Sequence, residues 1–306
     1  MKIASFNAER FRETKVSDPD VLSTLVKIVS QYDIIVVLEV VGVSGASIKL
    51  FLTEQMTVWY FRVNTSHHYA LQLSARLGRT RYKEQFMFLY RDDMVDLIDS
   101  YQYEDNQEND VDAFLREPYI LYFKLHNTVL KDLVLIQVRA TPQDSEKELD
   151  ELYDVFLMAR DKWETDNVMI LGDFRADGAS VTDKQMQNIR IRSDRNVHWL
   201  IGDDVDTTSA TTNNHTYDRI VVYGDDLLAT IVPNSAKAFN FQKEFNLTNK
   251  MELKVSDHYP SDLAELHCLW SLKDEVMSLQ TEILLLQREK FQLQISYLKK
   301  KLASVE

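Results

Sequence analysis

The chain has 306 residues, of which 45% are hydrophobic, so it is long enough for one large core with an appendage. Its formal net charge of -13 argues against a surface that holds nucleic acid through bulk positive charge, although a few local basic residues can still contact DNA. The single cysteine, Cys268, excludes an intrachain disulfide, and no apolar run is long enough to span a bilayer.

Short apolar runs that end in turn residues recur along the chain and predict strands. These runs cover residues 2–7, 34–38, 86–90, 120–125, 133–138, 168–171, 220–222 and 253–255. A helix is predicted to start at Ser17-Asp18-Pro19, and a second one from Asp144 to about Trp163. Residues 42–75 show no clear pattern. The alternation of strands and helices predicts an α/β sandwich.

Acidic residues stand at the ends of several predicted strands. They are Glu39 after residues 34–38, Asp173 after 168–171, Asp218 before 220–222, and Asp257 with His258 after 253–255. Side chains at the rigid edge of a sheet can hold a metal ion or position a water molecule. The sequence therefore predicts that these carboxylates and the histidine converge for metal-assisted hydrolysis.

Beyond residue 260 the pattern changes from strand-like to helix-like. Apolar residues follow alternating three- and four-residue steps from Leu269 to Tyr297, and Lys290 interrupts them once. We expect a domain over residues 1–260 and a coiled-coil tail over 261–306 that forms a homo-oligomer, or binds a helical partner, through 269–297. A long amphipathic helix folded onto the domain is the alternative.

Many segments of the chain occur in the order and spacing of the deoxyribonuclease I family, which residues 1–260 resemble. They are KIASFNAERFRETK, YDIIVVLEV, LGRTRYKEQFMFLYR, YQYEDN, FLREP, LGDFRAD, DTTSATTNNHTYDRIVV and SDHYP. The resemblance implies a four-layer α/β/β/α sandwich and endonucleolytic hydrolysis of DNA that depends on Mg²⁺ or Mn²⁺, with Ca²⁺. Family members continue after SDHYP into a final apolar strand, which the helix-like pattern predicts to be missing here.

The resemblance also implies roles for individual residues. The implied metal ligands are Glu39, Asp173 and Asp257. The implied catalytic residues are His258, the Asp218 that orients it, Glu84 and Asp173. The implied DNA or phosphate contacts are Asn7, Arg79, Tyr82, Arg116 and Tyr217. The simpler alternatives are a solvent-facing strand end for each acid and a solvated face for the DNA contacts.

Four positions depart from the family's pattern, and all lie in its catalytic or phosphate-gripping set. Arg139 stands in place of a second essential histidine, and it cannot act as a general acid or base because arginine does not deprotonate in proteins. We expect it to pair with Glu84 or to clamp a phosphate. Arg175 replaces an asparagine beside Asp173 and should repel a divalent ion or bind phosphate. Glu9 and Val41 replace arginines.

These departures leave two functions open. One is a metal-dependent DNA endonuclease whose activity is strongly impaired by Arg139 and Arg175. The other is a catalytically inactive nuclease-fold binding protein that oligomerises through its C-terminal helix. Leu71 and Leu73 alter the family's actin-contact stretch and argue against actin binding.

Features related to secretion point in different directions. The family is typically secreted and carries disulfides, whereas two of the disulfide positions here hold Gly178 and His215. The first strand follows Met1 directly, so the sequence shows no signal peptide, and either a leader has been removed or this version is intracellular. Three glycosylation sequons begin at Asn64, Asn214 and Asn246, but such short motifs also arise by chance. The compartment stays open.

Overall fold

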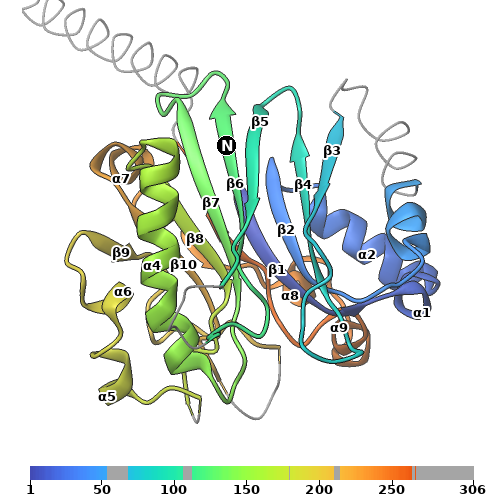
Figure 1. Cartoon of the computed structure of the whole chain (residues 1–306). Helices are drawn as coiled ribbons and strands as arrows, with labels where there is room; N and C mark the ends of the chain where they lie inside the picture. The colour runs from blue at the N-terminus through green and yellow to red at the C-terminus, as the bar shows by residue number, and fades with distance from the viewer. Residues whose placement is uncertain (54–67, 106–111, 179, 210–213, 264–265, 267–306) are drawn as a thin grey trace, which may run out of the picture.

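The computed structural model describes residues 1–53, 68–105, 112–178, 180–209, 214–263 and 266. Two six-stranded mixed sheets pack against each other, with helices on the outer side of each (Figure 1). This arrangement confirms the predicted four-layer α/β/β/α sandwich. The predicted helical tail over 267–306 lies outside the described residues, and so does most of the unpatterned stretch between 42 and 75.

The first sheet has the strand order β11-β12-β1-β2-β4-β3. Its strands are β1 (Ile3–Phe11), β2 (Ile34–Val40), β3 (Tyr69–Leu73), β4 (Gln85–Arg91), β11 (Ala236–Ala238) and β12 (Ser261–Leu263). The second sheet has the order β5-β6-β7-β8-β10-β9. Its strands are β5 (Val95–Gln102), β6 (Tyr119–Leu125), β7 (Asp132–Arg139), β8 (Val168–Asp173), β9 (Val197–Trp199) and β10 (Asp218–Tyr223).

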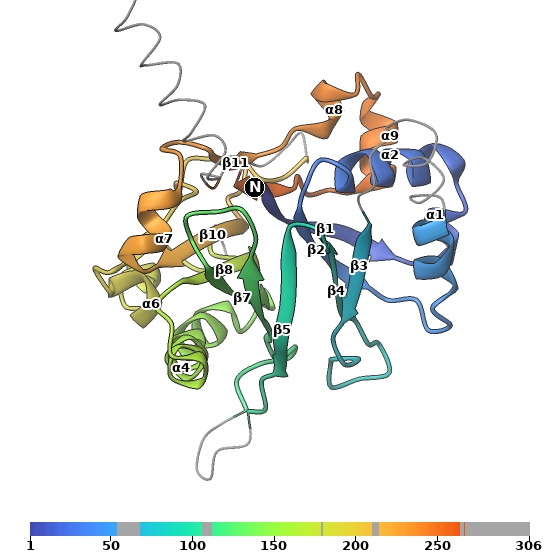
Figure 2. The same cartoon turned by 90° about the horizontal axis from the view of Figure 1, so that it is seen from above.

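Most helices cover the outer faces of the two sheets. The helices are α1 (Glu13–Val16), α2 (Pro19–Val29), α4 (Ser145–Trp163), α5 (Asp183–Met186), α6 (Arg190–Ser193), α7 (Asp225–Thr230), α8 (Phe241–Glu244) and α9 (Asn249–Val255). Of these, α7 packs Leu227 against the core between the sheets. Figure 2 shows α1, α2 and α9 beside the first sheet and α4 beside the second. The predicted start of α2 is confirmed, because Asp18 accepts hydrogen bonds from the backbone of Asp20 and Val21, a cap worth about 1 kcal/mol.

Alternation along the strands divides the core into layers. In β2, Ile34, Val36 and Leu38 lie between the two sheets, whereas Ile35 and Val37 pack against the helices. Successive side chains of a strand point to opposite faces, so a strand that is apolar throughout is buried on both. This explains why β2 could be read from the sequence as a continuous apolar run.

Two predictions about the end of the domain are wrong. Residues 253–255 are not a strand, because they form the last turn of α9, whose N-cap Thr248 accepts a hydrogen bond from the Met251 backbone. Residues 261–263, predicted to open the helical tail, instead form β12, which pairs with both β1 and β11. The domain therefore extends beyond residue 260, at least to Leu266, whose amide donates to the Met1 carbonyl.

No helix within the described ranges combines the length and the apolar character that crossing a membrane requires.

Candidate active site where the two sheets meet

The predicted acidic residues converge because strand pairing places their strand ends side by side. In the second sheet Asp173 is in register with Arg139 of β7 and with Asp218 of β10. The first sheet contributes Asn7, whose side-chain amide donates to Glu39 Oε1 at 3.1 Å and to Asp173 Oδ2 at 3.2 Å. One asparagine therefore joins carboxylates from both sheets.

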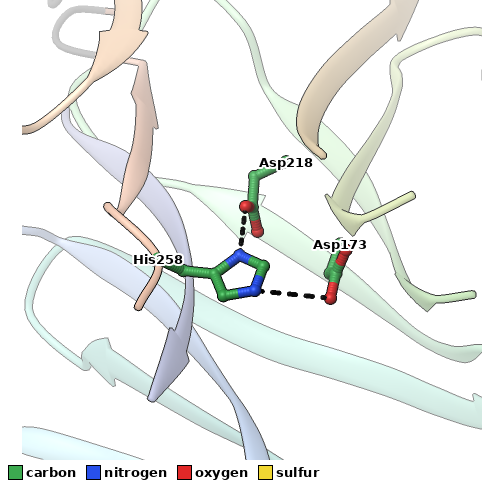
Figure 3. A group of neighbouring side chains, drawn as sticks. All are labelled: Asp173, Asp218 and His258. Atoms are coloured by element: carbon green, nitrogen blue, oxygen red, sulfur yellow. Dashed lines mark hydrogen bonds and ion pairs between the residues drawn. The ribbon is translucent and has the colours of Figure 1, made fainter. Parts of the chain in front are cut away.

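Asp218 and His258 form a buried acid–imidazole pair (Figure 3). Nδ1 of His258 lies 2.6 Å from Asp218 Oδ2, and its Nε2 lies 4.0 Å from Asp173 Oδ2 and 3.9 Å from Asp257 Oδ1. Burial lowers the pKa of His258, but Asp218 and Asp173 outweigh burial and raise this pKa to about 9. The imidazole is thus oriented by one carboxylate and turned toward another, an arrangement that suits proton transfer.

Arg139 joins two of the predicted acids, Glu39 from the first sheet and Glu84. Its Nη2 lies 2.5 Å from Glu39 Oε1 and its Nε lies 3.2 Å from Glu84 Oε2. The expected pairing with Glu84 is present, and the pairing with Glu39 is an addition. Burial raises the pKa of Glu39, but Arg139, together with hydrogen bonds from Asn7 and Arg10, lowers it to about 2. Glu39 is therefore a fixed anion whose negative charge is already compensated.

Arg175 lies against the acid–imidazole pair. Its Nε is 3.2 Å from Asp173 Oδ2, its Nη2 is 3.3 Å from His258 Nε2, and its guanidinium stacks over the Tyr217 ring at 4.5 Å. A guanidinium donates but never accepts, so this contact with Nε2 is favourable only when that nitrogen carries no proton. Arg175 therefore opposes the protonated imidazole that Asp218 and Asp173 favour.

The loops that hold Gly178 and His215 are joined by polar contacts and side-chain packing. His215 Nδ1 lies 3.3 Å from Asp177 Oδ2, and the Thr216 amide donates to the same oxygen at 2.8 Å. Gly178 has a φ of +62°, and a Cβ there would lie 2.9 Å from the His215 ring. His215 in turn stacks on Tyr217 with ring centroids 4.6 Å apart. These contacts position Tyr217 and, through it, Arg175.

Several residues that shape the site act through the backbone, and we did not predict them. The Arg10 amide donates to Glu39 Oε2 at 3.1 Å. Ser256 Oγ donates to the Asn7 carbonyl at 2.6 Å and accepts from the His258 amide at 3.0 Å. Lys15 Nζ donates to the carbonyls of residues 8, 9 and 255. All three lie in segments that carry the family resemblance, Arg10 and Lys15 in KIASFNAERFRETK and Ser256 in SDHYP, but residue type alone does not indicate these backbone contacts.

Backbone strain is concentrated at the site. Glu9, Arg10, Glu39 and Arg175 have φ values of 44°, 54°, 57° and 49°. Non-glycine residues in this left-handed region each cost on the order of 1–3 kcal/mol, and such residues cluster at functional sites. Glu9 and Arg10 form the bulge of β1, where the register with β2 shifts between Asn7 and Phe11.

A cavity of about 330 Å³ adjoins this bulge. Its lining includes the acidic residues Glu9 and Asp18 and the basic residues Arg10, Arg12, Lys15 and Lys254. Glu9 replaces an arginine of the family's pattern, so by that resemblance it places negative charge where the DNA backbone would pass. In the structure, the basic residues that line the same cavity surround this negative charge with positive charge.

The remaining predicted residues differ in how deeply they are buried and in which residues they contact. Arg116 is buried, and its Nη2 lies 2.5 Å from Glu84 Oε1. Arg79 is half exposed and pairs with Asp112 at 2.8 Å, and Tyr82 is exposed. Val41 is half-buried. The DNA contacts implied for Arg79, Tyr82 and Arg116 stay predictions.

The residues do not fit a divalent ion at Glu39 in this arrangement. Carboxylates are the ligands such ions prefer, and the buried Asp173 Oδ1 has no hydrogen-bond partner among the described residues. Yet both Glu39 oxygens accept hydrogen bonds, one of them from a guanidinium. Asp173, Asp218 and His258 offer ligand atoms within 4.8 Å of one another, but Arg175 contacts two of the three.

Comparison with known proteins gives a consistent result. A model of the endonuclease/exonuclease/phosphatase family matches residues 4–258. Deoxyribonuclease gamma of Homo sapiens is 40% identical over 260 residues, which cover 85% of this chain and 84% of the relative. Deoxyribonuclease-1 of Bos taurus is 40% identical over 264 residues, which cover 86% and 91%.

A solved structure supports the fold. An endonuclease/exonuclease/phosphatase from Bacteroides vulgatus has a TM-score of 0.57 at 13% identity, covering 87% of this chain and 98% of the other. At that identity the likeness concerns the fold alone. The family model and the deoxyribonuclease relatives lead to one conclusion: this chain is a deoxyribonuclease I-like member of the endonuclease/exonuclease/phosphatase family.

Proposed function

We propose that this protein engages DNA phosphodiesters at the site around Asp173 and hydrolyses them with strongly impaired activity. The observation that carries the proposal is the contrast between two neighbouring pairs. Asp218 and His258 keep a 2.6 Å contact that can serve proton transfer, while Glu84 and Arg139 form an ion pair that cannot. Half of the proton-transfer machinery is therefore retained.

The retained residues support specific roles. His258, oriented by Asp218, would protonate the leaving oxygen, and Asn7 and Tyr217 would position the phosphate. The family's activity depends on divalent ions, by resemblance Mg²⁺ or Mn²⁺ with Ca²⁺, which neutralise charge on the phosphoryl oxygens. In this chain, Arg139 and Arg175 already neutralise Glu39 and Asp173, which supports impairment rather than full activity.

Nicking of supercoiled plasmid in Mg²⁺ or Mn²⁺ with Ca²⁺ tests the proposal. We expect a rate at least about 10²-fold below that of an intact relative, because a positioned acid–base group contributes about 10²–10⁴-fold. Asp218→Ala measures the background. Changing Arg139→His and Arg175→Asn together should recover part of the activity. Fast nicking by the unaltered chain that Asp218→Ala abolishes would contradict the impairment.

A catalytically inactive binding protein is the second candidate. The same two arginines favour it, because they add positive charge where a phosphate would lie. Fluorescence anisotropy with a labelled duplex separates the candidates: binding without any cleavage above the Asp218→Ala background supports the second. If nicking survives and responds to the double reversion, the first holds.

Oligomerisation through residues 269–297 remains a proposal, since these residues lie outside those described. Removal of residues 267–306 should convert an oligomer to a monomer in sedimentation velocity. An unchanged mass would contradict the coiled coil.

A further inference from the structure

Charges of alternating sign run through the interior of the site. Arg116 contacts Glu84, Glu84 contacts Arg139, and Arg139 contacts Glu39. We propose that the Arg139 guanidinium takes the place of a divalent ion at Glu39. This chain then binds no divalent ion there unless Arg139 is replaced by an uncharged side chain. The inference rests on the proposed function only in taking Glu39 as the ion-binding carboxylate.

The first support is the occupancy of Glu39. Its Oε1 receives Arg139 Nη2 at 2.5 Å and Asn7 Nδ2 at 3.1 Å, and its Oε2 receives the Arg10 amide at 3.1 Å. A divalent ion bonded to Oε1 would have to displace the guanidinium, which lies within direct hydrogen-bond distance. Both carboxylate oxygens therefore already accept hydrogen bonds, and Arg139 compensates the negative charge.

The second support is that Arg139 cannot leave easily. Its side chain is 11% exposed, and the pairing of β7 with β8 fixes its backbone beside Asp173. The planar fork of arginine reaches Glu39 and Glu84 at once, which a single ammonium could not do. Withdrawal of Arg139 would leave Glu84, whose side chain is 2% exposed, with Arg116 as its remaining ion-pair partner among the described residues.

The third support is what lies behind the arginine. Asn7 Nδ2 bonds both Glu39 Oε1 and Asp173 Oδ2, so these oxygens lie close together, and Asp173 Oδ1 is buried without a hydrogen-bond partner in the described part of the chain. Without the guanidinium, two carboxylates from different sheets would face one another. Oxygen ligands in that arrangement suit Mg²⁺, Mn²⁺ or Ca²⁺.

Titration with Mn²⁺, followed by the electron paramagnetic resonance signal of the free ion, tests the inference. We expect Arg139→Met to bind Mn²⁺ at least about 100-fold more tightly than the unaltered chain, because it removes a like charge a few ångströms from the ion. Arg139→Lys, which keeps the charge, should bind about as weakly as the unaltered chain. Adding Glu39→Gln to Arg139→Met should abolish the gain and thereby locate the ion.

Controls make each outcome decisive. Arg160→Met removes a guanidinium of the outer helix α4 that pairs with Asp166, and it should leave Mn²⁺ binding unchanged. Circular dichroism melts establish that the variants are folded. A folded Arg139→Met chain without tighter Mn²⁺ binding overturns the inference. If that variant does not fold, Glu39→Gln in the unaltered chain decides: unchanged Mn²⁺ binding supports the inference, and weaker binding overturns it.

The binding measurement is independent of hydrolysis. A chain that nicks no DNA can still show the gain of Mn²⁺ affinity, in which case the inference holds and the residual activity of the proposed function fails. If the unaltered chain nicks DNA but Arg139→Met binds Mn²⁺ no more tightly, the proposed function holds and the inference fails.

Discussion

Individual buried charges determine how this site responds to its surroundings. Glu39 has its pKa lowered to about 2 by Arg139, whereas Glu148, which is 1% exposed on α4, has its pKa raised to about 7 by burial. Hydrogen bonding from Thr141 to Glu148 lowers that pKa but does not offset burial. Two glutamates of one domain thus differ in charge near neutral pH because their partners differ.

Glu148 should make the protein less stable as the pH rises. A carboxyl whose folded pKa is raised binds its proton more tightly in the folded state, so its stabilisation is complete below the unfolded pKa of 4.5 and is lost toward pH 7. The free energy of unfolding should fall by about 3 kcal/mol across this window. In Glu148→Gln, urea unfolding between these pH values should lose this slope.

The neighbouring Glu146→Gln is the control for that measurement. Glu146 is exposed on the same helix, two positions before Glu148. Its replacement should therefore leave the fall of unfolding free energy with pH in place. A slope that persists in Glu148→Gln would assign the effect to another group.

At the scale of elements, the short strand β12 has a larger role than its length suggests. It lies between β11 and β1, so it covers the edge of β1 and connects β11 to the first sheet. Leu263 and Leu266 are both buried, and the Met1 amino group donates to the Leu266 carbonyl at 3.1 Å. An unpaired β1 edge would otherwise be exposed to other strands.

Two truncations test this role. A chain ending at residue 266 should unfold cooperatively, because every strand of the first sheet is retained. A chain ending at residue 260 should lose more than about 4 kcal/mol of unfolding free energy, since removing a buried leucine side chain costs about 2–5 kcal/mol. Thermal melts followed by circular dichroism compare the two, and equal stability would show that β12 is dispensable.

The sequence predicted the long buried strands well because runs such as residues 34–38 and 168–171 are apolar throughout. It failed at residues 253–255, because periodicity over three residues cannot separate strand from helix. The N-cap at Thr248 and the bond from Tyr259 to Glu252 determine the structure there. The strand β5 was missed because its exposed acids, Asp96 and Asp99, mask the alternation.

The candidate site was predictable only where side chains carry the chemistry. Glu39, Asp173 and Asp218 stand at or next to strand ends and His258 follows α9, and their residue types alone indicated them. Lys15 was not accessible in this way, because it acts by donating to carbonyls brought together by the fold. Likewise, no sequence pattern could show that Arg139 would reach Glu39 on the other sheet.

At the scale of the whole molecule, the distribution of charge matters more than its sum. The chain carries a net charge of -13, yet four basic residues line the cavity beside the β1 bulge. Lys15 uses its ammonium on three carbonyls, so its charge is not matched by a hydrogen-bonded carboxylate there. Local positive potential of this kind can hold a phosphate backbone on an acidic protein.

Replacement of Arg10 and Arg12 by glutamine should weaken DNA binding and its dependence on salt. Each lost phosphate contact lowers the slope of log affinity against log salt by about 0.9, so the double variant should lower the slope by about 2. Anisotropy titrations at several salt concentrations measure this. The control variant Arg160→Gln with Arg190→Gln also removes two positive charges, but from ion pairs on the α4 side of the molecule. An equal change of the salt slope in this control would contradict a DNA contact at Arg10 and Arg12.

The contact of His215 with Gly178 and Asp177 has a consequence for the chemical surroundings in which the protein keeps its shape. An imidazole packed over a bare α-carbon and held by a carboxylate contains no bond that a reductant can cleave. Thiol exchange and reductants therefore leave this loop closure untouched. The geometry of Tyr217, and with it that of Arg175, should be the same in dithiothreitol as in air.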